Sequence, residues 1–266
     1  MGSKRLEGKI ALVSGAGQRG NVIGTGRASA MLFSQAGAKV CLVDWNEESA
    51  AETQSIIESD GGTAFVKQAD VTKDTDCKAA IDSCINEFGS LDIVLNNVGG
   101  PGGGDVTELT ENLWEESLDR NLKSAAFMSK HAVPAMADSG GGSIIHVASI
   151  DGYRAGPSKN VPYSVAKGGV IQLTRTMAVH HGRENIRVNC IAPGHLHGPF
   201  VEQVSADLRE MRRRAGPLGT EGTAWDFAWA AVFLASDESR WISGVILPID
   251  AGLQAATPLS VLHNLV

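Results

Sequence analysis

The chain has 266 residues, 43% hydrophobic and 20% charged, which is typical of a globular protein with a sizeable core. A net charge of −7 argues against a nucleic-acid backbone as the main partner, and no apolar run is long enough to span a bilayer. The polar start has no secretory signal and the four cysteines form no CxxC pair, so we expect free thiols and a cytoplasmic protein.

Seven short apolar runs predict β-strands, because they are rich in β-branched residues and bounded by Gly, Asp or Asn. In chain order they are Lys9–Ser14, Lys39–Asp44, Thr63–Gln68, Leu91–Asn96, Ser143–Ala148, Asn185–Cys190 and Gly244–Ile249. Most lack polar–apolar alternation, as strands buried on both faces of a parallel sheet do. Helical patterns lie between them at 25–36, 47–59, 74–88, 111–137, 162–182 and 223–235. The alternation predicts an α/β fold, a three-layer doubly wound Rossmann fold with a mainly seven-stranded parallel sheet, in one domain over 1–266.

A glycine-rich loop follows the first strand, and a literal GxGxxG begins at Gly15. That motif should open a helix directly, but the residues just before Gly26 are poor helix formers. We therefore place the helix start at Gly24–Gly26 and interpret Gly17–Ile23 as an insertion. Gly15 would then make the tight turn, and Gly24 and Gly26 would allow close backbone approach. A pyrophosphate would lie on the amides at the positive end of the helix; the alternative is a glycine turn without a ligand.

Asp44 ends the second strand, 18 residues after Gly26. An acid at this place can accept hydrogen bonds from the adenosine ribose hydroxyls. Its charge would repel a 2′-phosphate, so it favours NAD over NADP, and Trp45 follows where a phosphate-binding arginine could stand. Arg19 and Arg27, in or beside the loop, argue the other way. The alternative role of Asp44 is to cap the next helix.

Tyr163 and Lys167 lie four residues apart at the start of an amphipathic helix and therefore share one of its faces. A free phenol has a pKa of about 10 and is a poor base at neutral pH. A nearby ammonium and a positive nicotinamide ring would both stabilise the phenolate. Alone, this spacing is common on surface helices, so its meaning depends on the rest of the chain.

With its other motifs, the chain from about residue 6 to 253 resembles the short-chain dehydrogenase/reductase family, in its compact single-domain branch. The motifs that carry the resemblance are Ser14-Gly15 with Gly24-Thr25-Gly26, Asp70-Val71, Asn96-Asn97-Val98-Gly99, Asn121, Ser149, Tyr163 with Lys167, and Pro193-Gly194. Each is modest alone, but their order along the chain makes chance implausible.

The resemblance implies that Tyr163 exchanges a proton with the substrate oxygen, and that Lys167 lowers the tyrosine pKa and holds the nicotinamide ribose. Ser149 would hydrogen-bond the substrate oxygen, and Asn121 would anchor a water that links the lysine to solvent. The implied catalytic residues are Asn121, Ser149, Tyr163 and Lys167. The implied cofactor-binding residues are Gly15, Gly24, Gly26, Asp44, Asp70, Val71, Asn97, Gly99, Tyr163, Lys167, Pro193 and Gly194.

The sequence departs from the family pattern at three places besides the long loop. His146 stands where the family often has Asn, and we expect a core histidine bonded to the backbone. Gly198 stands where the family often has a Thr that contacts the nicotinamide carboxamide. His195 and His197 flank the expected pocket and are assigned, with Ser149 and Tyr163, to the substrate. Because no carboxylate or cysteine cluster accompanies this histidine pair, we expect no metal.

Substrate selection is expected from Gly99–Asp105, Asp151–Asn160 and a lid at about 195–216, because loops at the carboxyl ends of strands build such pockets. Four arginines gather in that lid: Arg209, Arg212, Arg213 and Arg214. They indicate an acidic substrate or, as the preferred interpretation, a solvated or subunit-facing side of a helix.

The expected function is an NAD-preferring dehydrogenase of a small secondary alcohol or its ketone, with no nucleic-acid or membrane partner. The alternatives are an NADPH-dependent carbonyl reductase and a catalytically idle dinucleotide-binding scaffold on the same fold. An enoyl reductase is disfavoured, because that resemblance needs a wider Tyr–Lys spacing. The family implies a homotetramer or homodimer. The helices at 111–137 and 162–182 are candidate contacts, and the tail Gln254–Val266 packs on a neighbour or on its own chain.

Overall fold

The computed structural model describes residues 4–156 and 158–265; residues 1–3, 157 and 266, which fall in the expected domain, the 151–160 loop and the tail, lie outside the described residues. Seven strands form one sheet in the order β3-β2-β1-β4-β5-β6-β7. They are β1 Ile10–Ser14, β2 Lys39–Asp44, β3 Ala64–Gln68, β4 Ile93–Asn96, β5 Gly142–Val147, β6 Ile186–Pro193 and β7 Ile246–Ile249. Every pairing is parallel, which confirms the predicted seven-stranded parallel sheet.

The centre of the sheet is where the chain reverses its direction of growth. β1 pairs with β2 on one side and with β4 on the other, so that Val13 lies between Leu42 and Leu95. All three side chains are fully buried, as expected for strands covered on both faces. In open parallel sheets ligands bind beyond the carboxyl ends of the strands at such a switch point.

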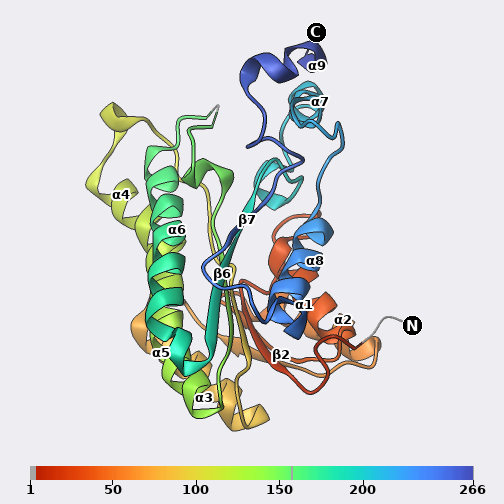
Figure 1. The fold of residues 1–266 in the computed structure, drawn as a ribbon, viewed down its shortest axis with the longest axis vertical. Helices are drawn as coiled ribbons and strands as arrows, with labels where there is room; N and C mark the ends of the chain where they lie inside the picture. The colour runs from red at the N-terminus through yellow and green to blue at the C-terminus, as the bar shows by residue number, and fades with distance from the viewer. Residues whose placement is uncertain (1–3, 157, 266) are drawn as a thin grey trace.

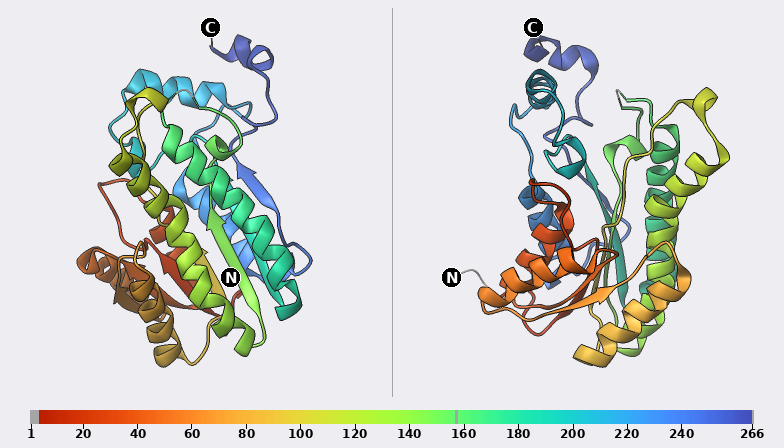
Figure 2. Two further views of the ribbon diagram at one scale, coloured as in Figure 1. Left: turned by 90° about the vertical axis from the view of Figure 1, so that its left-hand side faces the viewer. Right: turned by 180° about the vertical axis from the view of Figure 1, so that it is seen from behind.

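Helices cover both faces of the sheet and make the predicted three layers (Figures 1 and 2). One layer holds α1 Thr25–Gln35, α2 Glu47–Ser59 and α8 Ala224–Ala235. The other holds α3 Asp74–Phe88, α4 Glu111–Leu118, α5 Ser124–Asp138 and α6 Val161–His181. Helix α7 Ala206–Ala215 and the short α9 Leu262–Leu265 lie apart from both layers, at the top of Figure 1.

Short helical turns complete the described chain. The 3-10 turns are η1 Val106–Glu108, η3 Ile150–Gly152, η4 Gly182–Glu184, η5 Pro199–Val201, η6 Asp237–Ser239 and η7 Pro258–Val261. A π-turn, η2 Asp119–Lys123, joins α4 to α5. Among the helices described, none is long and apolar enough to cross a membrane.

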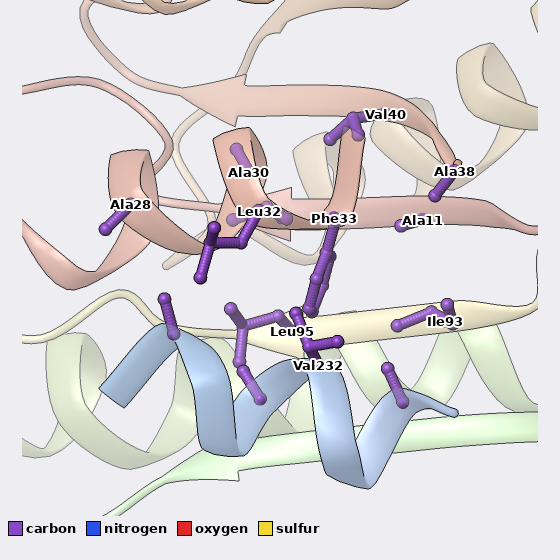
Figure 3. Packing of buried hydrophobic residues seen from close by; sticks show 14 of the residues in the cluster. Ala11, Ala28, Ala30, Leu32, Phe33, Ala38, Val40, Ile93, Leu95 and Val232 are labelled. Atoms are coloured by element: carbon purple, nitrogen blue, oxygen red, sulfur yellow. The ribbon is translucent and has the colours of Figure 1, made fainter. Parts of the chain in front are cut away.

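The larger core lies between the sheet and the layer of α1 and α8 (Figure 3). Phe33 points from α1 towards Leu95 of β4, where Val232 of α8 also packs, and all three are fully buried. Ala28 and Ala30 keep the α1 surface small, so the two helices approach closely. Full burial of a phenylalanine side chain contributes about 1.5–3 kcal/mol, so this contact helps to fix α1 against the sheet.

Three predicted elements differ from the structure. The helix expected at 111–137 is interrupted by the π-turn, and β6 continues three residues beyond Cys190 to Pro193. Helix α7 was not among the predicted helices, because a segment with four arginines in ten residues is too polar overall to indicate a core-facing helix. The π-turn contains Asn121 and the extension of β6 ends at Pro193, so both differences change where predicted site residues lie.

Candidate active site

The glycine loop, the start of α1 and the end of β4 meet at the switch point. Helix α1 begins at Thr25 with Gly24 as its N-cap, which confirms the predicted start. A Cβ on Gly26 would collide with the carbonyl oxygen of Gly15 and lie 2.6 Å from Nδ2 of Asn97. Thr25 Oγ1 donates to Asn97 Oδ1 at 2.7 Å. Four of the residues predicted to bind cofactor therefore lie together.

Asp44 connects the end of β2 to the inserted loop. Its Oδ2 accepts from the backbone N–H of Gly17 at 2.9 Å, and its Oδ1 accepts from that of Asn46, the N-cap of α2, at 3.0 Å. The loop continues past the exposed indole of Trp45, where the guanidinium carbon of Arg19 lies 5.4 Å from the ring centroid. Asp44 thus orders the loop and supports the start of α2 at once.

The far side of the inserted loop contacts the lid. The backbone N–H of Asn21 donates to both carboxylate oxygens of Glu202, at 3.1 and 3.2 Å, and its side-chain amide donates at 3.1 Å. Gly20 lies against the same carboxylate with a positive φ of 67°. The insertion is therefore anchored at the end of β2 through Asp44 and at the expected lid through Glu202.

Arg27, one of two arginines considered for a phosphate contact, is already hydrogen-bonded to residues of α2. Its Nε donates to Thr53 Oγ1 at 2.9 Å, and its Nη2 donates to Glu52 and to the Ser49 carbonyl at 2.9 and 3.0 Å. The side chain is buried between α1 and α2 and serves their packing. Arg19 is the arginine that remains on the loop surface.

Asp70 and Val71 follow β3 at the same edge of the sheet. Val71 is 5% exposed, and the Asp70 carboxylate accepts from the N–H and Oγ1 of Thr72 at 3.1 and 2.7 Å. Burial raises the pKa of Asp70, but hydrogen bonds from Thr72 and Lys73 outweigh it and hold that pKa below its usual value. The carboxylate is therefore ionised and fixed in place at neutral pH.

Ser149, Tyr163 and Lys167 converge between β5 and α6. Lys167 is 3% exposed; its Nζ donates to the Val147 carbonyl at 2.8 Å and lies 5.7 Å from the centroid of the Tyr163 ring. The Ser149 side chain is close enough to the Tyr163 phenol to lower its pKa. It also accepts from the Asp151 N–H at 3.1 Å. The three side chains predicted for the chemistry are thus brought together.

The close packing of η3 on α6 fixes this arrangement. A Cβ on Gly152 would lie 2.8 Å from the carbonyl carbon and oxygen of Lys167. Only glycine lets the turn approach α6 so closely, and the turn begins directly after Ser149. The distance between the serine and the helix face therefore depends on this contact.

Burial dominates the titration of the site. It lowers the pKa of Lys167 to about 8, and it raises the pKa of Tyr163 above its ordinary value. The hydrogen bond from Ser149 lowers the Tyr163 pKa, and the negative charge of Asp151 raises it. A phenolate at this position is therefore stabilised by the serine and opposed by burial and the aspartate.

Asn121 points inward from the π-turn and is 1% exposed. Its Oδ1 accepts from the Gly100 N–H at 3.0 Å, and its Nδ2 donates to the Gly100 and Ser117 carbonyls, both at 3.0 Å. A Cβ on Gly99 would lie 3.0 Å from Asn121 Oδ1 and 3.2 Å from Lys167 Nζ. The asparagine and the lysine therefore flank the same glycine, and the π-turn is a feature often found at functional sites.

His146 is a fully buried core histidine, as expected, but its partner is a side chain and not the backbone. Its Nδ1 lies 3.2 Å from Nδ2 of Asn96, which also donates to Ser129 Oγ at 3.1 Å. Burial and then the charge of Lys167 lower the His146 pKa to about 4. The ring is therefore neutral at neutral pH and carries no proton for catalysis.

Two of the expected substrate loops are tied to each other. The Gly104 N–H donates to the Lys159 carbonyl at 3.0 Å, and the Val161 N–H donates to the Gly104 carbonyl at 3.1 Å. The Lys159 ammonium lies 2.7 Å from an Asp105 carboxylate oxygen. Gly102 lies beside Tyr163, because a Cβ there would be 3.5 Å from the tyrosine Cβ. The paired loops therefore border the phenol.

The turn after β6 directs the two predicted substrate histidines to different neighbours. Gly194 donates its N–H to the Ile249 carbonyl at 2.8 Å and begins the lid. His195 is partly buried among Arg212, Arg154 and Asp151, and burial and the arginines lower its pKa. His197 acts on Glu221 and lowers the pKa of that carboxyl. Within 4–156 and 158–265, no three His, Cys, Asp or Glu side chains are grouped to hold a metal.

Comparisons with known proteins identify similar sequences. A family model described as enoyl-(acyl carrier protein) reductase matches residues 20–254. A borneol dehydrogenase of Lavandula x intermedia is 37% identical, with 94% of this chain and 92% of the relative aligned. A cis-4-hydroxycyclohexanecarboxylate dehydrogenase of Sinomonas cyclohexanicum is 34% identical over 93% of this chain and 97% of its own.

Solved structures repeat the fold over nearly the whole chain. A protein of Burkholderia xenovorans assigned as a short-chain dehydrogenase/reductase superposes with a TM-score of 0.91 at 38% identity, covering 95% of this chain and 99% of its own. A 7α-hydroxysteroid dehydrogenase, in complex with NADH and 7-oxo glycochenodeoxycholic acid, gives a TM-score of 0.88 at 31% identity, covering 94% and 96%.

Proposed function

The chain belongs to the short-chain dehydrogenase/reductase family, and from this premise we propose that it moves a hydride between NAD and a secondary alcohol or its ketone. Family membership makes it an oxidoreductase that uses NAD or NADP. One observation carries the finer proposal: Ser149, Tyr163 and Lys167 lie together, with Lys167 Nζ 5.7 Å from the centroid of the Tyr163 ring and with Ser149 lowering the pKa of the phenol. A scaffold without activity would not need this group.

The switch point fits a dinucleotide. Gly26 and Gly15 approach until no Cβ fits between them, and the start of α1 offers backbone amides to a pyrophosphate. At the adenosine end we assign Asp44, Asp70 and Val71. The remaining cofactor contacts proposed for this chain are Gly24, Asn97, Gly99, Lys167, Pro193 and Gly194. When bound, the nicotinamide supplies or accepts the hydride.

The chain's own residues handle the proton. Ser149 Oγ orients the substrate oxygen, and Tyr163 Oη takes its proton during oxidation and returns it during reduction. Lys167, whose Nζ lies 5.7 Å from the centroid of the Tyr163 ring, is assigned the positive charge that favours the phenolate against the effects of burial and Asp151. Asn121, beside the lysine at Gly99, holds the position of a water that leads the proton to solvent.

The preference for NAD rests on Asp44, whose carboxylate stands at the end of β2 and would repel a 2′-phosphate. One observation supports the second candidate function, an NADPH-dependent carbonyl reductase. Arg19 stacks on Trp45 next to Asp44 and could pair with that phosphate. Because Arg27 is committed to α2, Arg19 would have to do this alone.

The substrate class we infer is a small cyclic secondary alcohol. The relatives named above act on borneol, a hydroxycyclohexanecarboxylate and a hydroxysteroid, all of them rings that bear a hydroxyl group. The spacing of Tyr163 and Lys167 supports carbonyl chemistry and not enoyl reduction. The four cysteines are buried and unpaired, which supports a reducing compartment such as the cytoplasm.

The test follows nicotinamide absorbance at 340 nm with a panel of cyclic and aromatic secondary alcohols and ketones, in parallel with NAD+ or NADP+ and with their reduced forms. We expect turnover with NAD+ to exceed turnover with NADP+. The reverse preference would select the NADPH-dependent reductase.

Tyr163→Phe should lower turnover by about 10²–10⁴-fold while NADH binding, followed by fluorescence, survives. Tyr153→Phe is the matched control, because Tyr153 is the only other tyrosine of the chain and donates only to the Ile246 carbonyl at 3.4 Å. Undiminished turnover in Tyr163→Phe would overturn the assigned mechanism. Absence of dinucleotide binding by the wild-type protein would overturn the proposed function itself.

A further inference from the structure

The arginines of helix α7 do not share one environment. Arg209 is exposed and forms two hydrogen bonds with the Glu221 carboxylate, one of 2.7 Å from Nε and one of 2.5 Å from Nη2. Arg213 is also exposed and pairs in the same way with Glu210, at 2.7 and 2.6 Å. Both have the solvated, ion-paired role that the sequence favours for the cluster.

Arg212 faces a different side of the helix. It is half-buried, and its hydrogen bond runs from Nη2 to the carbonyl of Leu196, two residues beyond the Pro193-Gly194 turn. Within 4–156 and 158–265 no carboxylate lies within ion-pair distance of it. Of the acids that act on it, Glu221 is held by Arg209, and the other is Asp151. Burial disfavours its charge and lowers its pKa, as expected for a cation without a counter-ion.

The neighbours of Arg212 connect it to the reactive phenol. The charge of Asp151 acts on the pKa values of Arg212, His195 and Tyr163, and the Asp151 N–H donates to Ser149 Oγ at 3.1 Å, so this acid stands beside the reactive group. The Asp151 carboxylate accepts from Asn160 Nδ2 at 3.0 Å, which fixes it on the side of the 151–160 loop.

The electrostatic balance at His195 is positive. At His195 the effect of Arg212 is the largest of any charge, that of Arg154 is next, and that of Asp151 is the smallest. Arg154 is exposed and lies two residues after the end of η3, on the side of the 151–160 loop. At His195 the two arginines therefore outweigh the one acid.

We propose that Arg212 binds an anionic group of the substrate, and that the substrate is therefore a cyclic alcohol or ketone that carries a carboxylate. This inference rests on the proposed function, because the same molecule must present its hydroxyl to Tyr163. A carboxylate suits the site, since the planar guanidinium retains N–H donors beyond the one used for Leu196 and binds carboxylates in a bidentate manner. Arg154 adds long-range attraction from the opposite loop.

The experiment compares two ligands of one shape that differ in charge, cyclohexanecarboxylate and cyclohexanecarboxamide. Calorimetric titration into the full chain with bound NADH gives a dissociation constant for each. We expect the wild-type protein to bind the carboxylate at least about tenfold more tightly than the amide. Arg212→Gln keeps a donor for the Leu196 carbonyl but loses the charge, and should bring the two constants within about twofold. Arg212→Lys should retain part of the preference.

Arg213→Gln is the matched control, because this exposed neighbour on the same helix is already paired with Glu210. It should leave the carboxylate preference unchanged. The inference is overturned if the wild-type protein shows no preference, binds neither ligand at concentrations up to about 20 mM, or keeps the preference in Arg212→Gln.

Turnover separates this failure from failure of the proposed function. Oxidation of cyclohexanol or of methyl 4-hydroxycyclohexanecarboxylate with NAD+, without any carboxylate preference, would remove the inference and leave the proposed function standing. Carboxylate binding that depends on Arg212, in a protein that oxidises no alcohol and binds no dinucleotide, would overturn the proposed function and with it the assignment of the carboxylate to an alcohol substrate. Only the anion site at Arg212 would remain.

Discussion

His146 illustrates at the scale of one residue how burial decides a protonation state. The ring is enclosed between β4 and β6, and Nδ1 can accept from Asn96 Nδ2 only while it is unprotonated. The Lys167 charge further disfavours a second positive charge nearby. Because the His146 ring stays neutral, Lys167 is the only cation among these neighbours at the base of the site.

This arrangement predicts an acid-dependent loss of stability. The unfolded histidine takes up its proton near its usual pKa of about 6.5, and the folded one only at about 4. Its contribution is complete above pH 6.5 and is lost as the pH falls towards 4. The free energy of unfolding should therefore decrease by about 3 kcal/mol over that window through this residue. Urea unfolding at pH 7 and pH 4 measures the change.

His146→Asn is the comparison, because an amide can keep a hydrogen bond to Asn96 and does not titrate. Its stability should fall less steeply with acid than that of the wild-type protein, by about the same 3 kcal/mol. Equal slopes for the two proteins would mean that His146 takes up its proton in the folded state.

At the scale of elements, the contact between the glycine turn and α1 sets the geometry of the cofactor end. Gly26→Ala should destabilise the protein by about 1–3 kcal/mol, because its methyl group would meet the Gly15 carbonyl and Asn97. It should also weaken NADH binding, since the helix start would move away from β4. Urea unfolding and a fluorescence titration with NADH measure the two effects.

Gly24→Ala, two residues earlier at the N-cap of α1, is the matched control. A Cβ there meets nothing nearer than Pro199 Cγ at 3.7 Å, and φ is −87°. Loss of the preferred N-cap residue should lower the stability by less than about 1 kcal/mol. Similar stability losses in both variants would contradict the close approach at Gly26.

The elements that could be predicted from the sequence are those whose signal is local. β-branched runs between Gly, Asp and Asn gave all seven strands, and the poor helix formers before Gly24 gave the start of α1. The π-turn was missed because Asp119–Lys123 has ordinary helical residues, and the extra residue in a turn leaves no mark in composition. Helix α7 was missed because its ten residues, four of them arginine, are polar overall and none is buried, so no core-facing pattern indicates it.

The same distinction holds for the site. The neighbouring positions of Tyr163 and Lys167 follow from a spacing of four on a helix. The contact of Asn21 with Glu202 joins residues 181 apart, and no pattern near either one predicts it. The different neighbours of His195 and His197 likewise depend on the course of the chain after Gly194.

At the scale of the whole molecule, one continuous sheet joins the segments from β1 to β7, so we propose that the chain folds as a single domain. Helix α6 carries two exposed valines on one face, Val165 at 47% and Val179 at 78% exposure. They lie 14 residues apart, about four helical turns, on one side of the helix, and Gln172 and Thr176 are exposed between them. We propose α6 as a contact in a dimer or tetramer.

Light scattering should give a particle mass of two or four chains for the wild-type protein. Val179→Asp should shift that mass towards one chain, because a buried unpaired carboxylate at the contact is unfavourable. Leu218→Asp, at a 73% exposed position in the lid region, is the control and should leave the mass unchanged. Leu259→Asp, in the tail, tests the other proposed contact. A wild-type monomer would contradict both contacts.

The π-turn between α4 and α5 links the aim of one side chain to the register of a long helix. One residue more or fewer rotates everything downstream by about 100°. Deleting a residue there would swing Asn121 away from Gly100 and at the same time turn Met128 and Met136 of α5 out of the core. The orientation of the Asn121 amide and the side of α5 that faces the core therefore change together. An insertion or deletion that misplaces the Asn121 amide would also disrupt the packing of α5. Selection against unstable proteins alone would therefore preserve the length of the π-turn.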